Sequence, residues 1–147
     1  MPDKIVVDTN IWVSALVSPR GMAAELVEQW RKGNFTLIVS EQQITELSDV
    51  LSRSKFSDKY HISEKQVTNI VAPIIEKAER VTIRGNITCC RDLDDNMLIE
   101  AAVRGQAKYL ITGDKDIRDD KEVSSFLARN GVIVISVAKF LDLIRKA

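Results

Sequence analysis

Acidic residues occur at four places where their carboxylates could act together. Asp8 directly follows the apolar stretch 5–7, and Asp114 follows the predicted strand 108–112 after one glycine. Glu46 lies in a segment with helical periodicity, at the border of its apolar stripe. A further acidic run, 92–95, opens a segment of helical length that is apolar nearly all round. Carboxylates that gather at one place repel one another, so a cation among them would stabilise the group.

The types of residue present favour a hard cation. The chain has a single histidine, His61, and its two cysteines, Cys89 and Cys90, are adjacent and lack the spacing of metal ligands. An all-oxygen set of ligands suits Mg²⁺ or Mn²⁺, and such ions bridge carboxylates in enzymes that act on phosphodiesters. The sequence contains no glycine-rich phosphate loop with a lysine and no G-x-G-x-x-G, which argues against a nucleotide-triphosphate or dinucleotide site.

Each acid also has a simpler interpretation. Asp8 could cap a helix, Glu46 could be a surface residue and Asp114 could stabilise a turn. Capping would account for one acid of the run 92–95 but not readily for all three. Taken together, these simple interpretations are less convincing than each is alone. Parallel strands would bring Asp8, Asp114 and this run to one edge of a sheet, where ligands of α/β proteins bind.

Apolar periodicity and helix signals predict alternating strands and helices. Ser40 and Ser63 each begin a sequence typical of a capping box, and Pro73 should kink or divide the second of these helices. Strands are predicted over 5–7, 35–39, 81–83, 108–112 and 132–135; helices over 11–17, 21–33, 41–53, 63–80, 92–104, 121–130 and 137–146; and a loop over 54–61. This alternation predicts an α/β fold with a parallel sheet covered by helices.

Length and composition set the broad class. The chain has 147 residues, of which 45% are apolar and 29% charged, so we expect one globular domain over residues 1–147. A formal net charge of zero argues against a strongly basic nucleic-acid-binding surface but not against a local basic rim. No apolar run approaches the ~20 residues of a membrane helix. Residues 1–4 lack the features of a signal peptide, so we expect a cytoplasmic protein.

The acidic motifs together resemble a known family. The stretches are Val6-Val7-Asp8-Thr9-Asn10, the helical Glu46, Arg91-Asp92-Leu93-Asp94-Asp95-Asn96 and Leu110-Ile111-Thr112-Gly113-Asp114-Lys115-Asp116, with further likeness over 51–56 and 134–141. This combination resembles the PIN domain, and more narrowly the VapC-like toxins of bacterial toxin–antitoxin systems. The likeness covers almost the whole chain.

The resemblance implies a fold, an activity and a set of site residues. The fold would be a three-layer α/β/α sandwich around a central, mainly parallel five-stranded sheet. The activity would be an endoribonuclease dependent on Mg²⁺ or Mn²⁺ that cleaves single-stranded RNA, uses no side chain as nucleophile and leaves a 5′-phosphate. The cation ligands carried across are Asp8, Glu46, Asp95 and Asp114, with Asp116 as a more variable fifth acid; Thr9, Asn10 and Thr112 match positions that orient ligands or phosphate. Leu93 stands where the pattern often has proline, so whether Asp92 or Asp94 caps the helix stays open.

The resemblance also implies partners, and two other functions compete with it. We expect a cognate antitoxin protein and a homodimer, with residues 54–80 and the aromatic Phe56 and Tyr60 forming part of the interface. A receiver-type phosphoacceptor domain would need an acidic pair after the first strand and a lone aspartate after 81–83, and the sequence has neither. A non-catalytic nucleic-acid-binding module on the PIN fold would have lost acids, and none is lost.

Overall fold

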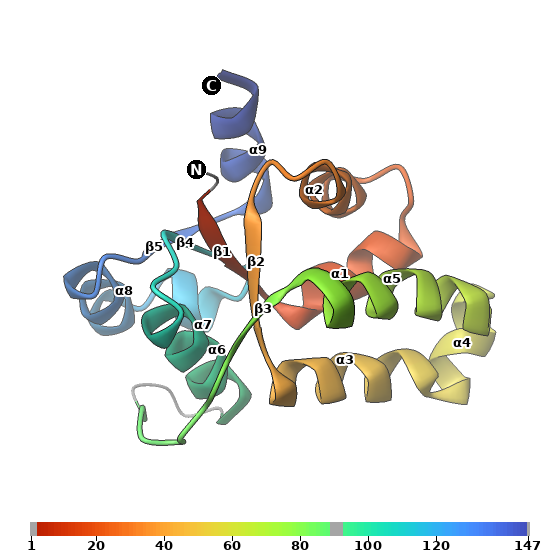
Figure 1. The fold of residues 1–147 in the computed structure, drawn as a ribbon, viewed down its shortest axis with the longest axis horizontal. Coiled ribbons are helices and arrows are strands. Elements are labelled where there is room, and N and C mark those ends of the chain that lie inside the picture. Colours follow the sequence, from red (N-terminus) through yellow and green to blue (C-terminus); the bar gives the residue numbers. More distant parts are fainter. Residues whose placement is uncertain (1–2, 89–92, 147) are drawn as a thin grey trace.

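A five-stranded sheet runs through the middle of the protein (Figure 1). The computed structural model describes residues 3–88 and 93–146. The strands are β1 (Lys4–Val7), β2 (Thr36–Ser40), β3 (Glu79–Val81), β4 (Tyr109–Ile111) and β5 (Ile133–Ile135). They lie in the order β3-β2-β1-β4-β5, and each neighbouring pair is parallel. The predicted parallel α/β sheet is therefore confirmed.

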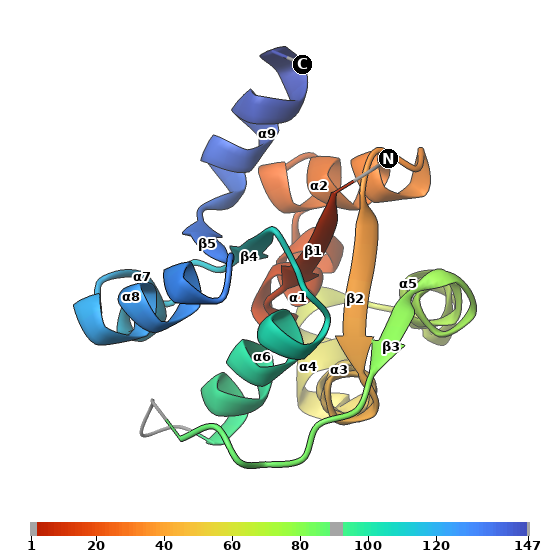
Figure 2. The same ribbon diagram turned by 60° about the vertical axis from the view of Figure 1, so that its left-hand side comes forward.

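Helices cover both faces of this sheet (Figures 1 and 2). On one face lie α1 (Thr9–Val17), α2 (Met22–Arg31), α3 (Glu41–Ser52), α4 (Ser54–Tyr60), α5 (Glu64–Lys77) and α9 (Val137–Lys146). On the other face lie α6 (Leu93–Arg104), α7 (Lys115–Arg118) and α8 (Lys121–Arg129). The protein is thus a three-layer α/β/α sandwich, as predicted.

The buried strand residues supply a core to each face. Side chains alternate along a strand, so Ile5 and Val7 enter the core beneath α1 and α3, whereas Val6 enters the core beneath α6. All three are at most 1% exposed. A strand covered on both faces needs apolar residues throughout, which explains the unbroken apolar run before Asp8.

Two connections differ from the sequence prediction. Residues 54–61 were predicted as a loop, and Ser54–Tyr60 instead forms the helix α4. Phe56 and Tyr60 are four residues apart, and their rings contact each other at a tilt with 5.1 Å between centroids, while Phe56 packs on the core. His61 then ends the helix in the left-handed conformation. The polar composition concealed this short apolar face.

The segment around β3 is also displaced from its predicted position. Helix α5 ends at Lys77 rather than near Arg80, and β3 spans Glu79–Val81 rather than 81–83. Pairing with β2 fixes the register from Ile38 opposite Glu79 onward. Pro73 lies inside α5, which continues to Lys77 undivided. Tertiary pairing therefore decided a boundary that local patterns could not.

The strand order creates a crevice at the carboxyl ends of β1 and β4. These strands are neighbours, but the chain leaves β1 towards β2 on one side and leaves β4 towards β5 on the other. Such a reversal leaves the loops beyond the two strands apart, and ligands of open α/β sheets bind there. None of the described helices combines the length and apolar composition that crossing a bilayer requires.

Candidate active site

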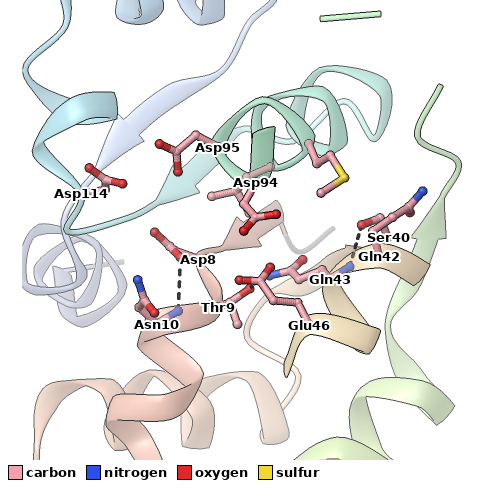
Figure 3. A pocket seen from close by; sticks show the side chains of 12 residues that line it. Asp8, Thr9, Asn10, Ser40, Gln42, Gln43, Glu46, Asp94, Asp95 and Asp114 are labelled. Carbon is pink, nitrogen blue, oxygen red and sulfur yellow. Dashed lines mark hydrogen bonds between the residues drawn. The ribbon is translucent and has the colours of Figure 1, made fainter. Parts of the chain in front are cut away.

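A polar cavity of about 140 Å³ lies at this edge of the sheet (Figure 3). Five of the residues lining it are acidic, and none of the described lining residues is basic. The lining residues are Asp8, Thr9, Asn10, Ser40, Gln42, Gln43, Glu46, Asp94, Asp95, Met97, Leu98 and Asp114. Four of the predicted ligands, Asp8, Glu46, Asp95 and Asp114, thus border one cavity, while their function as ligands stays a prediction.

Asp8 is held at the end of β1 by hydrogen bonds of its backbone and of its side chain. Its backbone N–H donates to the carbonyl oxygen of Ile111 in β4 at 2.9 Å. Its Oδ1 accepts from the N–H of Asn10 at 3.2 Å, which caps α1, and its Oδ2 accepts from the hydroxyl of Thr112 at 2.7 Å. Helix capping and a position in the cavity are therefore not alternatives for this residue.

Thr112 connects the two central strand ends. Its side chain is fully buried, and its hydroxyl donates to Asp8 while accepting from the backbone N–H of Asp114 at 3.0 Å. Asp114 in turn accepts from the N–H of Asp116 at 2.8 Å and caps α7, a one-turn helix that the sequence prediction missed. Two consecutive hydrogen bonds therefore fix Asp8, Thr112 and Asp114 relative to one another, and a third joins Asp114 to Asp116.

Glu46 enters the cavity from α3. The hydroxyl of Thr9 donates to its Oε2 at 3.4 Å. Ser40 caps α3 by accepting from the N–H of Gln43 at 3.1 Å, but the predicted capping box is only half formed. The Gln43 side chain instead donates from Nε2 to the carbonyl oxygen of Val7 at 2.6 Å. The box predicted at Ser63 is complete.

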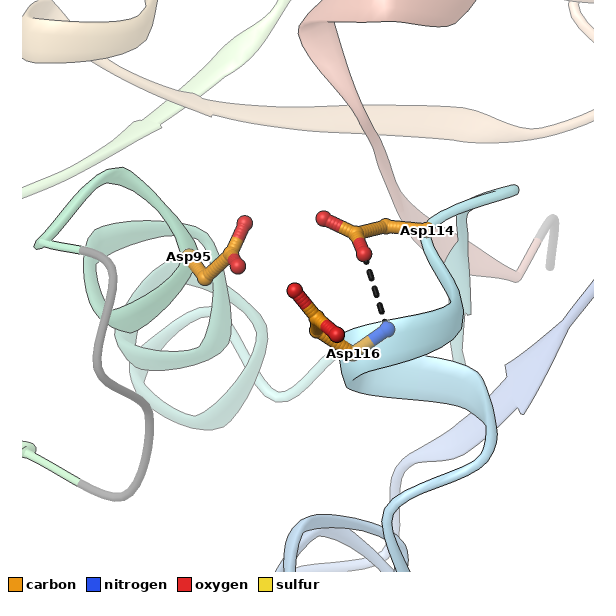
Figure 4. Close-up of side chains that lie close together, drawn as sticks. All are labelled: Asp95, Asp114 and Asp116. Carbon is orange, nitrogen blue, oxygen red and sulfur yellow. Dashed lines mark hydrogen bonds between the residues drawn. The ribbon is translucent and has the colours of Figure 1, made fainter.

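The closest group of acids comprises Asp95, Asp114 and Asp116. A carboxylate oxygen from each lies within 4.8 Å of the other two, from α6 and from both sides of the turn that begins α7 (Figure 4). This spacing suits a single cation bound by all three. Asp8 and Glu46 lie outside this group, while Asp94 extends towards the side of the cavity where Glu46 lies (Figure 3). Asp92 falls outside the described residues.

A buried carboxylate holds the connection that leads to α6. Glu100 is 1% exposed, and its two oxygens accept from the backbone N–H groups of Arg84 at 2.6 Å and Gly85 at 3.0 Å. The guanidinium of Arg104 also donates to it at 2.6 Å. Burial raises the pKa of Glu100, but these hydrogen bonds together outweigh burial and leave its pKa below the ordinary value. The charged form therefore anchors residues 84–85 to the helix that carries Asp94 and Asp95.

The position of Gln43 in the cavity was not predicted from the sequence. Gln43 lies three residues before Glu46, a spacing that puts both on one face of a helix. That signal was present, but the capping-box pattern assigned the side chain to a local bond. Glu100 was missed because a single charge within an apolar helix gives no pattern.

Comparison with known proteins identifies the family. The PIN domain profile matches residues 4–116, which carry every predicted site residue. The uncharacterized protein MJ1680 of Methanocaldococcus jannaschii is 27% identical over 129 residues, covering 88% of this chain and 82% of that protein. A chain of the crystal structure of VapBC2 from Rickettsia felis, bound to a DNA fragment from its promoter, matches the fold with a TM-score of 0.55 at 17% identity. That match covers 90% of this chain and 98% of the other. Because the PIN domain profile matches well over half of the chain, the chain belongs to the PIN domain family.

Proposed function

We propose that this protein is an endoribonuclease, dependent on Mg²⁺ or Mn²⁺, that hydrolyses phosphodiester bonds of single-stranded RNA. We further propose that residues 1–147 act as one nuclease domain. The observation that carries the proposal is the cavity beyond β1 and β4, which five carboxylates line without any basic side chain among the described lining residues. Membership of the PIN domain family supports a nuclease.

The residues present fit a hard divalent cation. Apart from the thioether of Met97, the possible ligand atoms on the described side chains in and beside the cavity are carboxylate, hydroxyl and amide oxygens, which Mg²⁺ and Mn²⁺ prefer. Asp95, Asp114 and Asp116 are close enough to share one ion, and Asp8 and Glu46 would complete the set of ligands. When bound, the cation would supply Lewis-acid activation of a water and neutralise charge on the phosphate.

The neighbouring residues would hold these ligands in place. Thr112 fixes one oxygen of Asp8, and Thr9 contacts Glu46, so each of these acids is oriented by a hydroxyl donor. Asn10 borders the cavity and would present its side-chain amide to a phosphate oxygen. A volume of about 140 Å³ suits a phosphate group and its cation rather than a nucleoside, so the bases would remain outside.

Cleavage of a labelled RNA tests the proposal. The wild type should cut a single-stranded RNA with Mn²⁺ and not with chelator, and the products should carry 5′-phosphates. Asp8→Asn and Asp114→Asn should lose about 100-fold or more in rate, as expected when a ligand of a catalytic cation is removed. The matched control is Asp142→Asn, an exposed aspartate on α9 that lies outside both the cavity and the segment 54–80. Binding of RNA without any metal-dependent cleavage would instead identify a non-catalytic binding module on the PIN fold.

We also propose that the nuclease is the toxin of a toxin–antitoxin pair, acting on RNA in the cytoplasm as a homodimer. The likeness in fold to a chain of the VapBC2 structure supports this assignment. Expression of the wild type should arrest growth of a host cell, and Asp8→Asn should not. Co-expression of a small protein from one of the neighbouring reading frames should relieve the arrest. If growth arrest persists when each neighbouring reading frame is co-expressed, the role as the toxin of a toxin–antitoxin pair is contradicted.

A further inference from the structure

Gln43 is an unusual residue to find buried. Its side chain carries two N–H donors and one oxygen acceptor, and burial of such a group is favourable only when its hydrogen bonds are made. Gln43 is nevertheless 7% exposed, in the first turn of α3. Its side chain therefore needs partners on both sides of the amide.

The donor side of the amide has a clear partner, and this fixes the orientation. Nε2 lies 2.6 Å from the carbonyl oxygen of Val7, the residue before Asp8. A carbonyl oxygen can only accept, so the nitrogen must face Val7 and the oxygen must point the other way. Gln43 thereby attaches the start of α3 to the end of β1, the two elements that carry Glu46 and Asp8.

The acceptor side has no such partner. Oε1 is buried, and no donor among the described residues lies within hydrogen-bonding distance of it. Gln43 lines the acidic cavity, and Figure 3 shows its amide group between Glu46 and Asp94. A buried oxygen with unused lone pairs beside two carboxylates is electrostatically unfavourable unless a positive charge or a donor occupies the space between them.

We propose that Gln43 supplies a neutral oxygen ligand to the divalent cation, on the side of the cavity formed by α3. This inference rests on the proposed function, since it assigns a further ligand to the same site. A neutral ligand suits this position, because it adds an oxygen to a cavity that already holds five carboxylates without adding to their repulsion. The bond from Nε2 to Val7 pre-orients that oxygen, so the residue both binds and positions.

Binding of Mn²⁺ by calorimetry, independent of catalysis, tests the proposal. Gln43→Met keeps the length of the side chain and removes the oxygen, so the Kd for Mn²⁺ should rise about 10–100-fold. Gln43→Glu keeps an oxygen ligand but removes the donor to Val7, so it should bind Mn²⁺ at least as tightly as the wild type. The control is Gln106→Met, an exposed glutamine just beyond the end of α6 opposite to Asp95 and outside the lining of the acidic cavity; its Kd should not change.

The outcomes separate a ligand from a structural contact. An unchanged Kd in Gln43→Met would overturn the proposal, and so would equal weakening in Gln43→Met and Gln43→Glu, since the lost contact with Val7 would then account for both. If Gln43→Met does not fold, judged by circular dichroism, Gln43→Glu decides alone, and weaker binding overturns the proposal. Failure of the wild type to bind Mn²⁺ at millimolar concentration would instead refute the cation-dependent function itself, and this inference with it.

Discussion

Replacing the buried Glu100 by glutamine should destabilise the protein more than the same replacement at an exposed glutamate. The carboxylate is 1% exposed and accepts from two backbone N–H groups and a guanidinium, at 2.6 to 3.0 Å. Glutamine keeps the shape but has one acceptor oxygen instead of two and adds an N–H group that would face donors. At least one donor among Arg84, Gly85 and Arg104 would then lose its partner.

The magnitude follows from the burial of this carboxylate. Breaking a buried ion pair by changing one partner typically costs about 3–5 kcal/mol, because the remaining charge keeps its desolvation without its partner. The Arg104 side chain is 29% exposed, and Arg84 and Gly85 are exposed residues, so water can replace part of what these donors lose and the cost should lie at the lower end of this range. We therefore expect the free energy of unfolding to fall by about 3 kcal/mol near neutral pH.

The pH dependence has a definite sign. The pKa of Glu100 in the folded state lies below its ordinary value of 4.5, so the folded protein binds fewer protons at this group than the unfolded chain does. The stability contributed by this group is complete above pH 4.5 and is lost as the pH falls through the lower, folded pKa. The difference in the free energy of unfolding between the wild type and Glu100→Gln should therefore be constant near neutral pH and should become smaller below pH 4.5.

Urea unfolding of both proteins between about pH 7 and about pH 3.5 measures this difference. The control is Glu76→Gln, an exposed glutamate on α5, which should change stability by less than about 0.5 kcal/mol. A loss below about 1 kcal/mol in Glu100→Gln would refute the anchoring role. If the two proteins differ by the same free energy of unfolding at acidic pH as at neutral pH, the charge of Glu100 is not what stabilises residues 84–85.

Three further predictions concern the site and the assembly. Thr112→Val should lower the free energy of unfolding by about 1.5–3 kcal/mol, since a buried donor to the charged Asp8 is lost, whereas Thr112→Ser should lose only about 1 kcal/mol; urea unfolding distinguishes them. Asp95→Asn removes one charge from three crowded carboxylates, so in chelator it should melt no lower than the wild type and should gain less from Mn²⁺; a clear loss in chelator with a full Mn²⁺ response would assign Asp95 to a purely structural role. Light scattering at micromolar concentration should give twice the monomer mass, and a monomer would contradict the proposed dimer.

The fold was predictable because its signals are long and mutually consistent. Buried strands with unbroken apolar runs, such as 5–7, can only pack inside a sheet covered on both faces. The sequence predictions were wrong at two elements whose structure depends on tertiary contacts. Helix α4 depends on one aromatic pair and a small apolar face, and β3 takes its register from β2 rather than from its own composition. No local pattern in the sequence contains either fact.

The candidate site was predictable in its position but not in its internal arrangement. Topology brings Asp8 and Asp114 to one edge of the sheet, and the sequence predicted that much. It could not predict that Asp116 would lie closer to Asp95 and Asp114 than Glu46 does, because the one-turn helix α7 was not recognised. Nor could the sequence predict the contacts of Gln43, whose side-chain amide donates to Val7 at the end of β1 and also borders the cavity.

The arrangement of hydrogen bonds explains how a chain can hold so many acids at one edge. Thr112 and Thr9 donate hydroxyl hydrogens to Asp8 and Glu46, and backbone N–H groups donate to Asp8 and Asp114. These donors are neutral, so they reduce the repulsion between carboxylates without cancelling their charge. A lysine or arginine in the same place would stabilise the empty cavity more strongly but would compete with a cation for the same oxygens. Neutral donors around charged acceptors therefore leave the cavity attractive to a divalent ion, and this favours a binding site over a set of structural caps.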